Sequence, residues 1–484
     1  MAFWGIAGIS LALASIASGS DPIEGIWLGQ VQAPQGTGAD IGFRFYAAKN
    51  GRLTFRMNFP EMFTYDQSFG IPVETIGHGR YVITEDLDIE LDLVGSRLSG
   101  TFGKGRLPMT LVRGEAFPPK PHAPAWPDPP SLLWQYEMGA GTWAAPVVAD
   151  GVVYIGTSAG VFHAVCAGNG GALWKWRADC PIDSRAVVGD EMVYFLDTRT
   201  ELIALGRKRG ELVWKTQLYD EALAGAKQPE NPTFNHRAAT PLLLDGVLYC
   251  GSGDGGVYAI DATTGAKLWR HEAGAAVYSG IGQSGRNTLL FGTMDGSIVL
   301  LDRVAKRETL RVKTGGGVVT TPIVSGGRII AGSRDYMLYG LNFPDGSVAW
   351  RFSYWFSWVE STPSVEDGLM YIGASDFARI TALDPSNGRA KWSTPVGGMN
   401  WGTPLVTKTG VFTGTVSQNM ERTVITHVGG LTALDRATGR PKWRLVATPA
   451  PEGAFGGYAG SLAIAGDKII AAGFDGRLIA LPAN

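Results

Sequence analysis

Apolar and polar residues alternate along most of this chain with a period of two, which is the pattern of β-strands. Glycine-containing turns interrupt the alternation, as in residues 256–269 (GVYAIDATTGAKLW), where the turn Thr263–Gly265 separates two apolar runs. The same phrase recurs and ends at Trp174, Trp214, Trp269, Leu310, Trp350, Trp392 and Trp443, the copies at Trp174 and Leu310 being degenerate. A period of about forty residues indicates a propeller, a solenoid or another repeat array.

Each repeat unit carries the features of four antiparallel strands. An apolar segment opens the unit, often with a Thr-Pro pair as at Thr240–Pro241, and a second strand such as Gly246–Gly251 follows. Four strands per unit is the composition of a propeller blade. The eighth unit, Ala459–Leu481, has three strands, and we expect Leu132–Glu137 to supply the fourth, which would hide the sheet edges. The predicted fold is therefore all-β, with an eight-bladed β-propeller over residues 131–484 that an N-terminal strand closes.

Residues 21–115 lack the tryptophan phrase and predict a small antiparallel β barrel or sheet. Leu87, Ile89, Leu91 and Leu93 alternate there with acidic residues, which favours a solvated strand face over a metal site. Residues 116–130 include seven prolines and predict a semi-rigid linker. The segments GIWLGQ, LSGTF and LPMTLVR resemble a small lipocalin-like domain, which implies a ligand-binding, stabilising or docking module.

Residues 1–20 predict a signal peptide. Residues 2–17 are small and apolar, too few for a comfortable membrane span, and lead into Ser-Ile-Ala-Ser. Because no Lys or Arg precedes them, an uncleaved anchor is the alternative. No other stretch is long and apolar enough to span a bilayer, so we expect a periplasmic or secreted protein without a stable membrane span.

Charge and motifs narrow the classes of function. The net charge of −2 gives no electrostatic reason to expect a nucleic-acid partner. The six histidines show no paired metal spacing, and the three cysteines include no adjacent pair. No Gly-x-Ser-x-Gly nucleophile motif or phosphate-binding loop is present. The sequence therefore predicts no metal site and no familiar catalytic motif.

The repeat phrase A-x-D-x-x-T-G-x-x-x-W resembles that of the pyrroloquinoline-quinone-type (PQQ-like) β-propeller family, and the resemblance covers residues 131–484. That family includes quinoprotein alcohol and sugar dehydrogenases. It also includes non-catalytic members such as the outer-membrane assembly lipoprotein of the β-barrel machinery. The resemblance implies that the repeated tryptophan packs between blades in both groups. Membership alone does not decide between catalysis and binding.

The segments that cross from the outer strand of one blade to the inner strand of the next should surround one mouth of the central channel. Several carry large or charged side chains where glycine, serine or threonine would suffice. We predict ligand contacts from Trp143, Arg185, Tyr278, Trp358, Asn400, Trp401 and Tyr458, and acid–base catalysis, if any, from His236, Arg237, Glu360 and Asp183. Such a mouth suits a flat, polar or anionic small molecule or an extended peptide, although the aromatic residues would equally serve to pack the loops.

The resemblance also implies PQQ with Ca²⁺ as a candidate cofactor. Trp143 or Trp401 would form the floor under the quinone, and Glu360 with Asn400 would supply oxygen ligands to Ca²⁺. Against this, the chain has neither the adjacent cysteine pair common in these dehydrogenases nor a CxxCH haem motif. The leading hypothesis is an exported binding or scaffold module, without a required cofactor, for a small molecule, a peptide or an envelope protein. The alternative is an enzyme using the same mouth, either a PQQ/Ca-dependent alcohol or sugar dehydrogenase or a cofactor-free catalyst.

Overall fold

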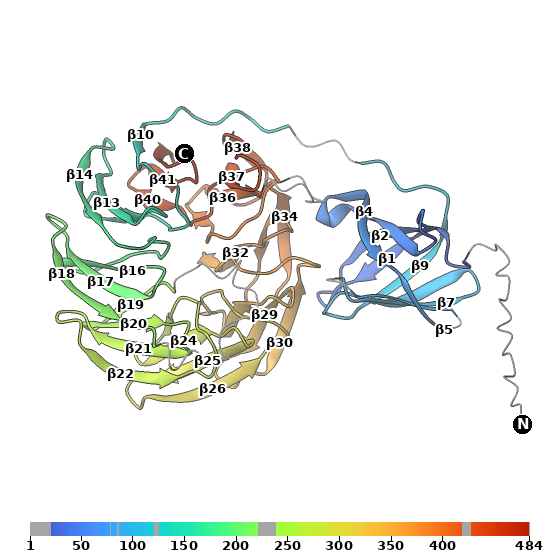
Figure 1. Cartoon of the computed structure of the whole chain (residues 1–484), viewed down its shortest axis with the longest axis horizontal. Coiled ribbons are helices and arrows are strands. Elements are labelled where there is room, and N and C mark those ends of the chain that lie inside the picture. The colour runs from blue at the N-terminus through green and yellow to red at the C-terminus, as the bar shows by residue number, and fades with distance from the viewer. Residues whose placement is uncertain are drawn as a thin grey trace, which may run out of the picture.

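Two β-structures follow one another along the chain, a nine-stranded antiparallel sheet and a ring of eight blades (Figure 1). The computed structural model describes residues 21–77, 79–84, 87–120, 125–220, 239–418 and 427–483, so the predicted signal peptide lies outside them. The one helix within these ranges is the short 3₁₀ turn η1 (Pro60–Met62), and none there is long and apolar enough to cross a membrane. The prediction of an all-β protein is confirmed.

The nine-stranded sheet, called the N-terminal sheet below, curls until it is nearly closed. Its spatial order is β4 (Thr64–Pro72), β3 (Leu53–Phe59), β2 (Gly38–Ala47), β1 (Gly25–Gln32), β9 (Leu107–Gly114), β8 (Arg97–Phe102), β7 (Ile89–Val94), β6 (Arg80–Ile83) and β5 (Glu74–Gly77). Fully buried aromatic rings fill its interior, among them Trp27, Phe43 and Phe55. On β7, Ile89 and Leu91 are buried while Asp92 is exposed, as the alternation predicted.

Each blade is an antiparallel sheet whose strands follow one another from the channel outwards. Blades one to four contain β11 (Val147–Ala149), β12 (Val152–Gly156), β13 (Val161–Cys166), β14 (Ala172–Arg177); β15 (Val187–Val188), β16 (Met192–Leu196), β17 (Glu201–Gly206), β18 (Leu212–Gln217); β19 (Leu242–Leu244), β20 (Val247–Gly251), β21 (Gly256–Asp261), β22 (Lys267–Glu272); and β23 (Gly282–Ser284), β24 (Thr288–Gly292), β25 (Ser297–Asp302), β26 (Arg307–Lys313). Blades five to seven contain β27 (Ile323–Ser325), β28 (Arg328–Gly332), β29 (Met337–Asn342), β30 (Val348–Ser353); β31 (Ser364–Glu366), β32 (Leu369–Gly373), β33 (Arg379–Leu383), β34 (Ala390–Pro395); and β35 (Leu405–Val406), β36 (Gly410–Gln418), β37 (Gly430–Asp435), β38 (Pro441–Val446), with β39 (Phe455–Gly457) paired to β36.

Blade eight closes the ring with strands from both ends of the array. It contains β40 (Ala463–Ala465), β41 (Lys468–Ala472), β42 (Arg477–Pro482) and, outermost, β10 (Trp134–Glu137). β10 pairs with β42 in an antiparallel register that places Trp134 opposite Ala480 and Glu137 opposite Arg477. The predicted closure by the segment after the prolines is confirmed.

The repeated tryptophan ties each blade to the next. The Trp174 indole Nε1 donates a hydrogen bond to the carbonyl of Arg207 at 2.9 Å, and the ring lies against Gly210. Gly210 has a φ of +73°, which glycine adopts without strain, and a Cβ there would lie 2.4 Å from the ring. The same contact with a left-handed glycine joins Trp134 to Gly170, Trp214 to Gly265, Trp350 to Gly388 and Trp392 to Gly439. The left-handed glycine of the phrase is therefore the position on which the tryptophan of the preceding blade packs.

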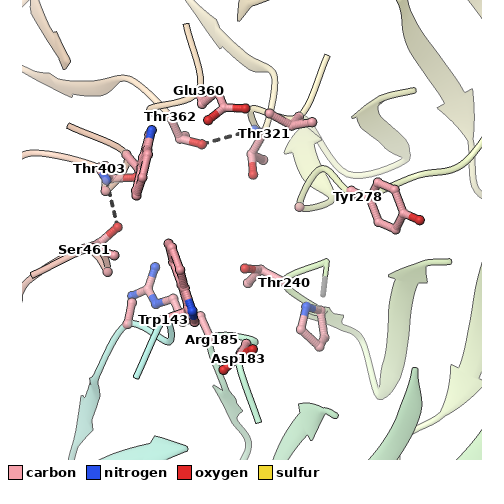
Figure 2. A pocket seen from close by; sticks show the side chains of 18 of the residues that line it. Trp143, Asp183, Arg185, Thr240, Tyr278, Thr321, Glu360, Thr362, Thr403 and Ser461 are labelled. Atoms are coloured by element: carbon pink, nitrogen blue, oxygen red, sulfur yellow. Dashed lines mark hydrogen bonds between the residues drawn. The ribbon is translucent and has the colours of Figure 1, made fainter. Parts of the chain in front are cut away.

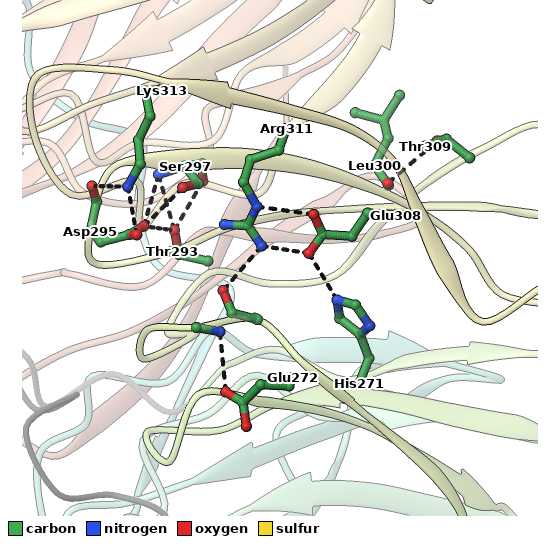
Figure 3. A network of polar contacts seen from close by, with 12 residues as sticks. His271, Glu272, Thr293, Asp295, Ser297, Leu300, Glu308, Thr309, Arg311 and Lys313 are labelled. Atoms are coloured by element: carbon green, nitrogen blue, oxygen red, sulfur yellow. Dashed lines mark hydrogen bonds and ion pairs between the residues drawn. The ribbon is translucent and has the colours of Figure 1, made fainter.

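Blade four replaces both halves of this contact. At the interface with blade three, Lys306, with a φ of +55°, stands in the place of the glycine. At the interface with blade five, Leu310 stands in the place of the tryptophan and lies against Gly346, whose φ is +75°. Polar contacts join blades three and four instead (Figure 3): His271 Nε2 on β22 lies 2.9 Å from Glu308 Oε1 on β26, and Arg311 Nη2 on β26 donates to the carbonyl of Ala273 at 3.1 Å. Arg311 Nε also donates to Glu308 Oε2 at 2.9 Å within β26. The degenerate repeat therefore retains a tie between blades but changes its chemistry.

The proline-rich segment packs against the propeller before it reaches β10. The guanidinium carbon of Arg444, on the outer strand β38, lies 5.9 Å from the ring centroid of Trp126. The backbone N–H of Arg444 donates to the carbonyl of Pro127 at 3.2 Å. The contact covers part of an edge strand, whose backbone groups would otherwise be open to pairing with another chain.

His163 lies at the junction of blade one with the closing strand. Its side chain is fully buried, and Nδ1 lies 3.1 Å from the hydroxyl of Tyr136 on β10. Burial, aided by the charge of Lys175, lowers the pKa of His163 from 6.5 to about 4. The imidazole is therefore neutral in the folded protein at pH values where the unfolded chain would protonate it.

We expect His163 to make the stability of the ring depend on pH. Between pH 6.5 and about 4 the unfolded chain binds the proton and the folded protein does not, so stability falls as the pH falls, by about 3 kcal/mol over the window. His163→Ile copies Ile203, which has the same register in blade two, and should remove this contribution. Urea unfolding of both proteins at about pH 4.5 and about pH 7 measures it, and equal pH dependence in the two would contradict the assignment.

We also expect the glycines on which the tryptophans pack to be intolerant of any side chain. Gly210→Ala should lower the free energy of unfolding by about 3 kcal/mol, because a left-handed alanine is strained and its Cβ overlaps Trp174. Gly246→Ala is the matched control, since Gly246 has a φ of +75° but open space around the Cβ, and it should cost only about 1 kcal/mol. Equal losses in chemical denaturation would show that backbone strain alone requires the glycine.

Candidate functional site

Two rings of residues from the crossover segments line one mouth of the channel, around a cavity of about 410 Å³ (Figure 2). The residue two positions before each inner strand forms the first, here called the threonine ring: Ala145, Arg185, Thr240, Gly280, Thr321, Thr362, Thr403 and Ser461. The residue four positions before the strand forms the second, called the mixed ring: Trp143, Asp183, Tyr278, Val319, Glu360, Trp401 and Ala459, while position 238 of blade three lies outside the described residues. Every blade thus places equivalent positions at the cavity.

Hydrogen bonds between neighbouring blades hold the threonine ring. The Thr321 N–H donates to Thr362 Oγ1 at 3.1 Å, and the Thr403 N–H donates to Ser461 Oγ at 2.8 Å, as Figure 2 shows. Small hydroxyl side chains suit this position because each satisfies a backbone donor of the adjacent inner segment. The ring presents hydroxyl groups to the cavity from several directions.

Arg185 is the one charged member of the threonine ring. Its side chain is exposed to the cavity, but the surrounding protein partly desolvates it, which lowers the pKa of its guanidinium. A partly desolvated guanidinium still carries its charge at neutral pH, because the usual pKa of arginine is above 12. Asp183, two residues earlier in the mixed ring, accepts a hydrogen bond from Ser158 Oγ at 3.2 Å. Blade two therefore brings a cation and a carboxylate to the mouth.

Aromatic residues of blades one, seven and eight form one wall. The ring centroids of Trp143 and Trp401 lie 5.6 Å apart, and Phe455 and Phe474 lie 5.0 Å and 4.7 Å from Trp143. Trp401 Nε1 donates to Ser375 Oγ at 3.0 Å, so its polar edge is satisfied within the wall. The wall offers a rigid apolar surface next to the charged groups of blade two.

Glu360 reaches the cavity already paired. The Arg334 Nε donates to Glu360 Oε1 at 2.8 Å, and Arg334 Nη2 lies 2.7 Å from the same oxygen. The guanidinium carbon of Arg334 lies 4.5 Å from the ring centroid of Trp358. Arg334 thus connects Glu360 of the mixed ring with Trp358, which is half-buried and not part of the cavity lining.

The structure brings together Trp143, Asp183, Arg185, Tyr278, Glu360 and Trp401 of the predicted site. It does not bring Asn400 and Tyr458 to the cavity. Both occupy the position five residues before the inner strand, whose members Thr142, Ile182, Val277, Val318, Val359, Asn400 and Tyr458 are all buried, and which we call the buried ring. Because neighbouring residues of the crossover point to opposite sides, a difference of one position moves a side chain from the channel into the blade core. His236 and Arg237 lie outside the described residues.

The side chain of Asn400 is buried and hydrogen-bonded to the backbone of blade seven. Its Nδ2 donates to the carbonyl of Gly414 at 2.9 Å, and its exposed fraction is 0%. The hydroxyl of Tyr458 is likewise enclosed, and burial, followed by the nearby Asp475 charge, raises its pKa. These two residues stabilise the walls of the mouth rather than line it.

The sequence analysis did not identify Arg334 and Phe474, although their shared position in the repeat could have indicated them. They occupy the same position in the turn between the second and third strands, where Ser158, Thr198 and Ser375 stand in other blades. In each case the turn N–H donates to the carbonyl six residues before the inner strand, as from Arg334 to Gly317 at 2.9 Å and from Phe474 to Gly457 at 3.0 Å. Large side chains at this turn position therefore lie beside the mouth.

The residues of the mouth do not fit the Ca²⁺ site of a quinoprotein. Glu360 is engaged by Arg334, and Asn400 is buried away from the cavity, so the two oxygen ligands expected for Ca²⁺ do not converge. Among the described residues, no group of three or more His, Cys, Asp or Glu side chains is placed to hold a metal ion. Trp143 and Trp401 remain as an aromatic wall without that ion site.

Comparison with known proteins agrees with the geometry of the ring. A family model described as outer membrane protein assembly factor BamB matches residues 127–253, 166–286, 253–355 and 355–484, well over half of the chain. The chain belongs to this family of PQQ-like propellers. The N-terminal sheet lies outside the matched residues.

Relatives of two kinds share the repeats. BamB of Yersinia pestis is 26% identical over 260 residues, which cover 50% of this chain and 62% of that protein. The quinoprotein ethanol dehydrogenase of Pseudomonas aeruginosa is 29% identical over 155 residues, 28% of this chain and 24% of the enzyme. Two further BamB relatives are covered to 46% and 54% of their lengths, so the chain matches roughly half of these proteins rather than the whole.

Solved structures of both kinds share the fold. BamB from Moraxella catarrhalis superposes with a TM-score of 0.53 at 14% identity, covering 73% of this chain and 97% of that one. Quinohemoprotein alcohol dehydrogenase from Comamonas testosteroni gives a TM-score of 0.51 at 16% identity, with 73% and 76% covered. At this identity the likeness establishes the fold alone.

The buried ring and the threonine ring should respond differently to truncation. Asn400→Ala should lower the free energy of unfolding by about 1.5 kcal/mol, because a buried hydrogen bond to the carbonyl of Gly414 is lost and only the longer one from Thr413 Oγ1 remains. Arg185→Ala should change it by less than about 0.5 kcal/mol, since its side chain is exposed and faces the cavity. Urea denaturation at neutral pH measures both, and a larger loss for Arg185→Ala than for Asn400→Ala would contradict the assignment of the two rings.

Proposed function

We propose that the protein is an exported binding or scaffold module of the bacterial envelope, which holds a partner at the mouth of its propeller. The observation that carries the proposal is the mouth itself, where all the blades contribute to one cavity with an aromatic wall, a charged segment and a ring of hydroxyls. The family match to an assembly factor supports an envelope partner.

The chemistry of the mouth favours recognition over reaction. Asp183 and Glu360 already have polar partners within the protein, Ser158 and Arg334, so each would have to give one up to act as an acid or a base. Fixed side chains of both charges beside aromatic rings suit the mixed polar and apolar surface of a peptide or a small polar molecule. The aromatic wall would supply apolar contact area to the bound molecule, and Arg185 with the other members of the threonine ring would orient its polar groups.

An enzyme is the second candidate, because quinoprotein dehydrogenases share the repeats and the fold. The neighbouring rings of Trp143 and Trp401 support this candidate, since a quinone would stack on such an aromatic surface. The mismatch of Glu360 and Asn400 with a Ca²⁺ site argues against the PQQ/Ca-dependent form. A cofactor-free catalyst would have to use Asp183 and Glu360 with His236 and Arg237.

Photo-crosslinking from the mouth tests the proposed binding function. A benzophenone amino acid at Val319, an uncharged member of the mixed ring, should capture a discrete envelope protein or peptide in cells that make the protein. The same group at Leu173, which is 53% exposed on the outer strand β14, is the matched control and should not capture it. Arg185→Ala combined with Trp143→Ala should abolish the adduct. Equal capture from both positions would contradict a role for the mouth.

A titration distinguishes the enzyme. The purified protein is mixed with PQQ and Ca²⁺, and absorption and alcohol- or sugar-dependent dye reduction are recorded together. We expect neither a bound chromophore nor turnover. A bound chromophore that turns over would replace the scaffold by a dehydrogenase.

A further inference from the structure

The N-terminal sheet contacts two segments of the propeller that both lead into the mouth. One is residues 353–360, which comprise the end of β30 and the first part of the crossover from blade five to blade six, including Glu360. The other is the turn 333–336 of blade five, which carries Arg334. Arg334 and Glu360 form the ion pair at the cavity, so the sheet contacts both of the segments that carry this pair.

The crossover is held by an aromatic clamp. The ring of Phe356 lies 4.2 Å from that of Phe102 and 6.1 Å from that of Phe59, measured between centroids. Phe59 also meets Trp355 edge to face at 5.4 Å. Phe59 and Phe102 are fully buried at the ends of β3 and β8, so the clamp is anchored in the core of the N-terminal sheet.

The end of β30, where the crossover begins, is held by hydrogen bonds to its backbone. The Ser353 N–H donates to Gln35 Oε1 at 3.1 Å, and Gln35 Nε2 lies 3.5 Å from the Ser353 carbonyl. One glutamine side chain thus satisfies both backbone groups of a residue, as a paired strand would. A further ion pair joins Glu61 to Arg379 of blade six at 3.3 Å.

The turn is held from the same side. Lys104 Nζ lies 5.7 Å from the ring centroid of Tyr336, and Met337 packs so closely on Gly105 that a Cβ there would lie 2.4 Å from its Cε. Tyr336 in turn meets the ring of Phe356 at 6.4 Å. The N-terminal sheet therefore joins the turn and the crossover through one continuous contact.

Only short stretches of chain separate these contacts from the ion pair. Arg334 precedes Tyr336 by two residues, and Glu360 follows Phe356 by four. Trp358, on which Arg334 lies, falls between Phe356 and Glu360. A shift of the clamp would therefore move the carboxylate and the guanidinium relative to one another.

We propose that the N-terminal sheet is a positioning element for the mouth: by clamping Phe356 it holds Arg334 and Glu360 in the arrangement that faces the cavity. The functional consequence rests on the proposed function, because it assumes that the mouth binds a partner. The structural consequence does not, and it can be measured in the protein without any ligand. In this proposal the N-terminal sheet, which lies outside the residues matched by the family model, adapts the mouth of the propeller to the partner of this protein.

The test follows the Nε–H groups of two arginines by ¹⁵N-resolved solvent exchange in the full chain. Arg334 Nε donates to Glu360, and Arg303 Nε donates to the carbonyl of Arg286 at 3.0 Å in blade four. Their side chains are similarly covered, 14% and 11% exposed, so Arg303 is the internal reference. Phe356→Ala should accelerate exchange at Arg334 about fivefold and leave Arg303 unchanged. Phe356→Leu, which keeps most of the apolar volume, should restore most of the protection.

Two further variants test whether the effect on Arg334 is specific to the contact with the N-terminal sheet. Gln35→Ala removes the backbone contact without touching the aromatic core and should also accelerate exchange at Arg334. Phe343→Ala removes a phenylalanine that is 39% exposed elsewhere on blade five and should leave both arginines unchanged. Unchanged exchange at Arg334 in both Phe356→Ala and Gln35→Ala would overturn the proposal, as would equal acceleration at Arg303. Failure of the crosslinking or quinone experiments would leave this result standing, because no ligand enters it.

Discussion

The contact between a tryptophan ring and the left-handed glycine of the next blade is the constraint on which the propeller depends. It uses both parts of the repeat phrase, since the tryptophan ends one blade and the glycine shapes a turn in the following one. The indole also donates to a carbonyl of that turn, so position and orientation are both set. Because this contact joins each of these blades only to the next one, the ring is built from nearest-neighbour contacts.

The two exceptions show why the contact matters. Between blades three and four, Lys306 takes the place of the glycine, and polar contacts of His271, Glu308 and Arg311 join the two blades. Between blades four and five, Leu310 takes the place of the tryptophan and lies against Gly346. At blade eight the outer strand is β10, which precedes the other strands of that blade in the chain, so no turn of the repeat phrase joins β42 to it. Trp443, the tryptophan facing that blade, is buried, and its Nε1 finds no acceptor among the described residues. Closure thus replaces one repeated contact by strand pairing.

The ring of blades gathers equivalent positions of separate crossovers around one cavity. Each described crossover alternates between the channel and the blade core, so the same two positions of successive blades line the cavity and the position beside them is buried, wherever the structure describes these positions. The tie between the turn N–H and the crossover carbonyl brings a third position, that of Arg334 and Phe474, beside the mouth. Variation at these positions changes the chemistry of the mouth without disturbing the contacts between blades.

The repeat phrase and the period-two alternation determined the strands, the blade and the missing eighth outer strand, because these depend on contacts between residues near in sequence or one repeat apart. The same register predicted Trp143, Asp183, Arg185, Tyr278, Glu360 and Trp401 at the mouth. It could not separate them from Asn400 and Tyr458, since one residue of register decides between channel and core and the crossovers have no regular strand pattern. The pairing of Glu360 with Arg334, and the clamp of the N-terminal sheet on Phe356, join residues far apart in the chain. Only the tertiary structure decided these contacts, because they depend on how separate segments pack in space and not on the local pattern of either segment.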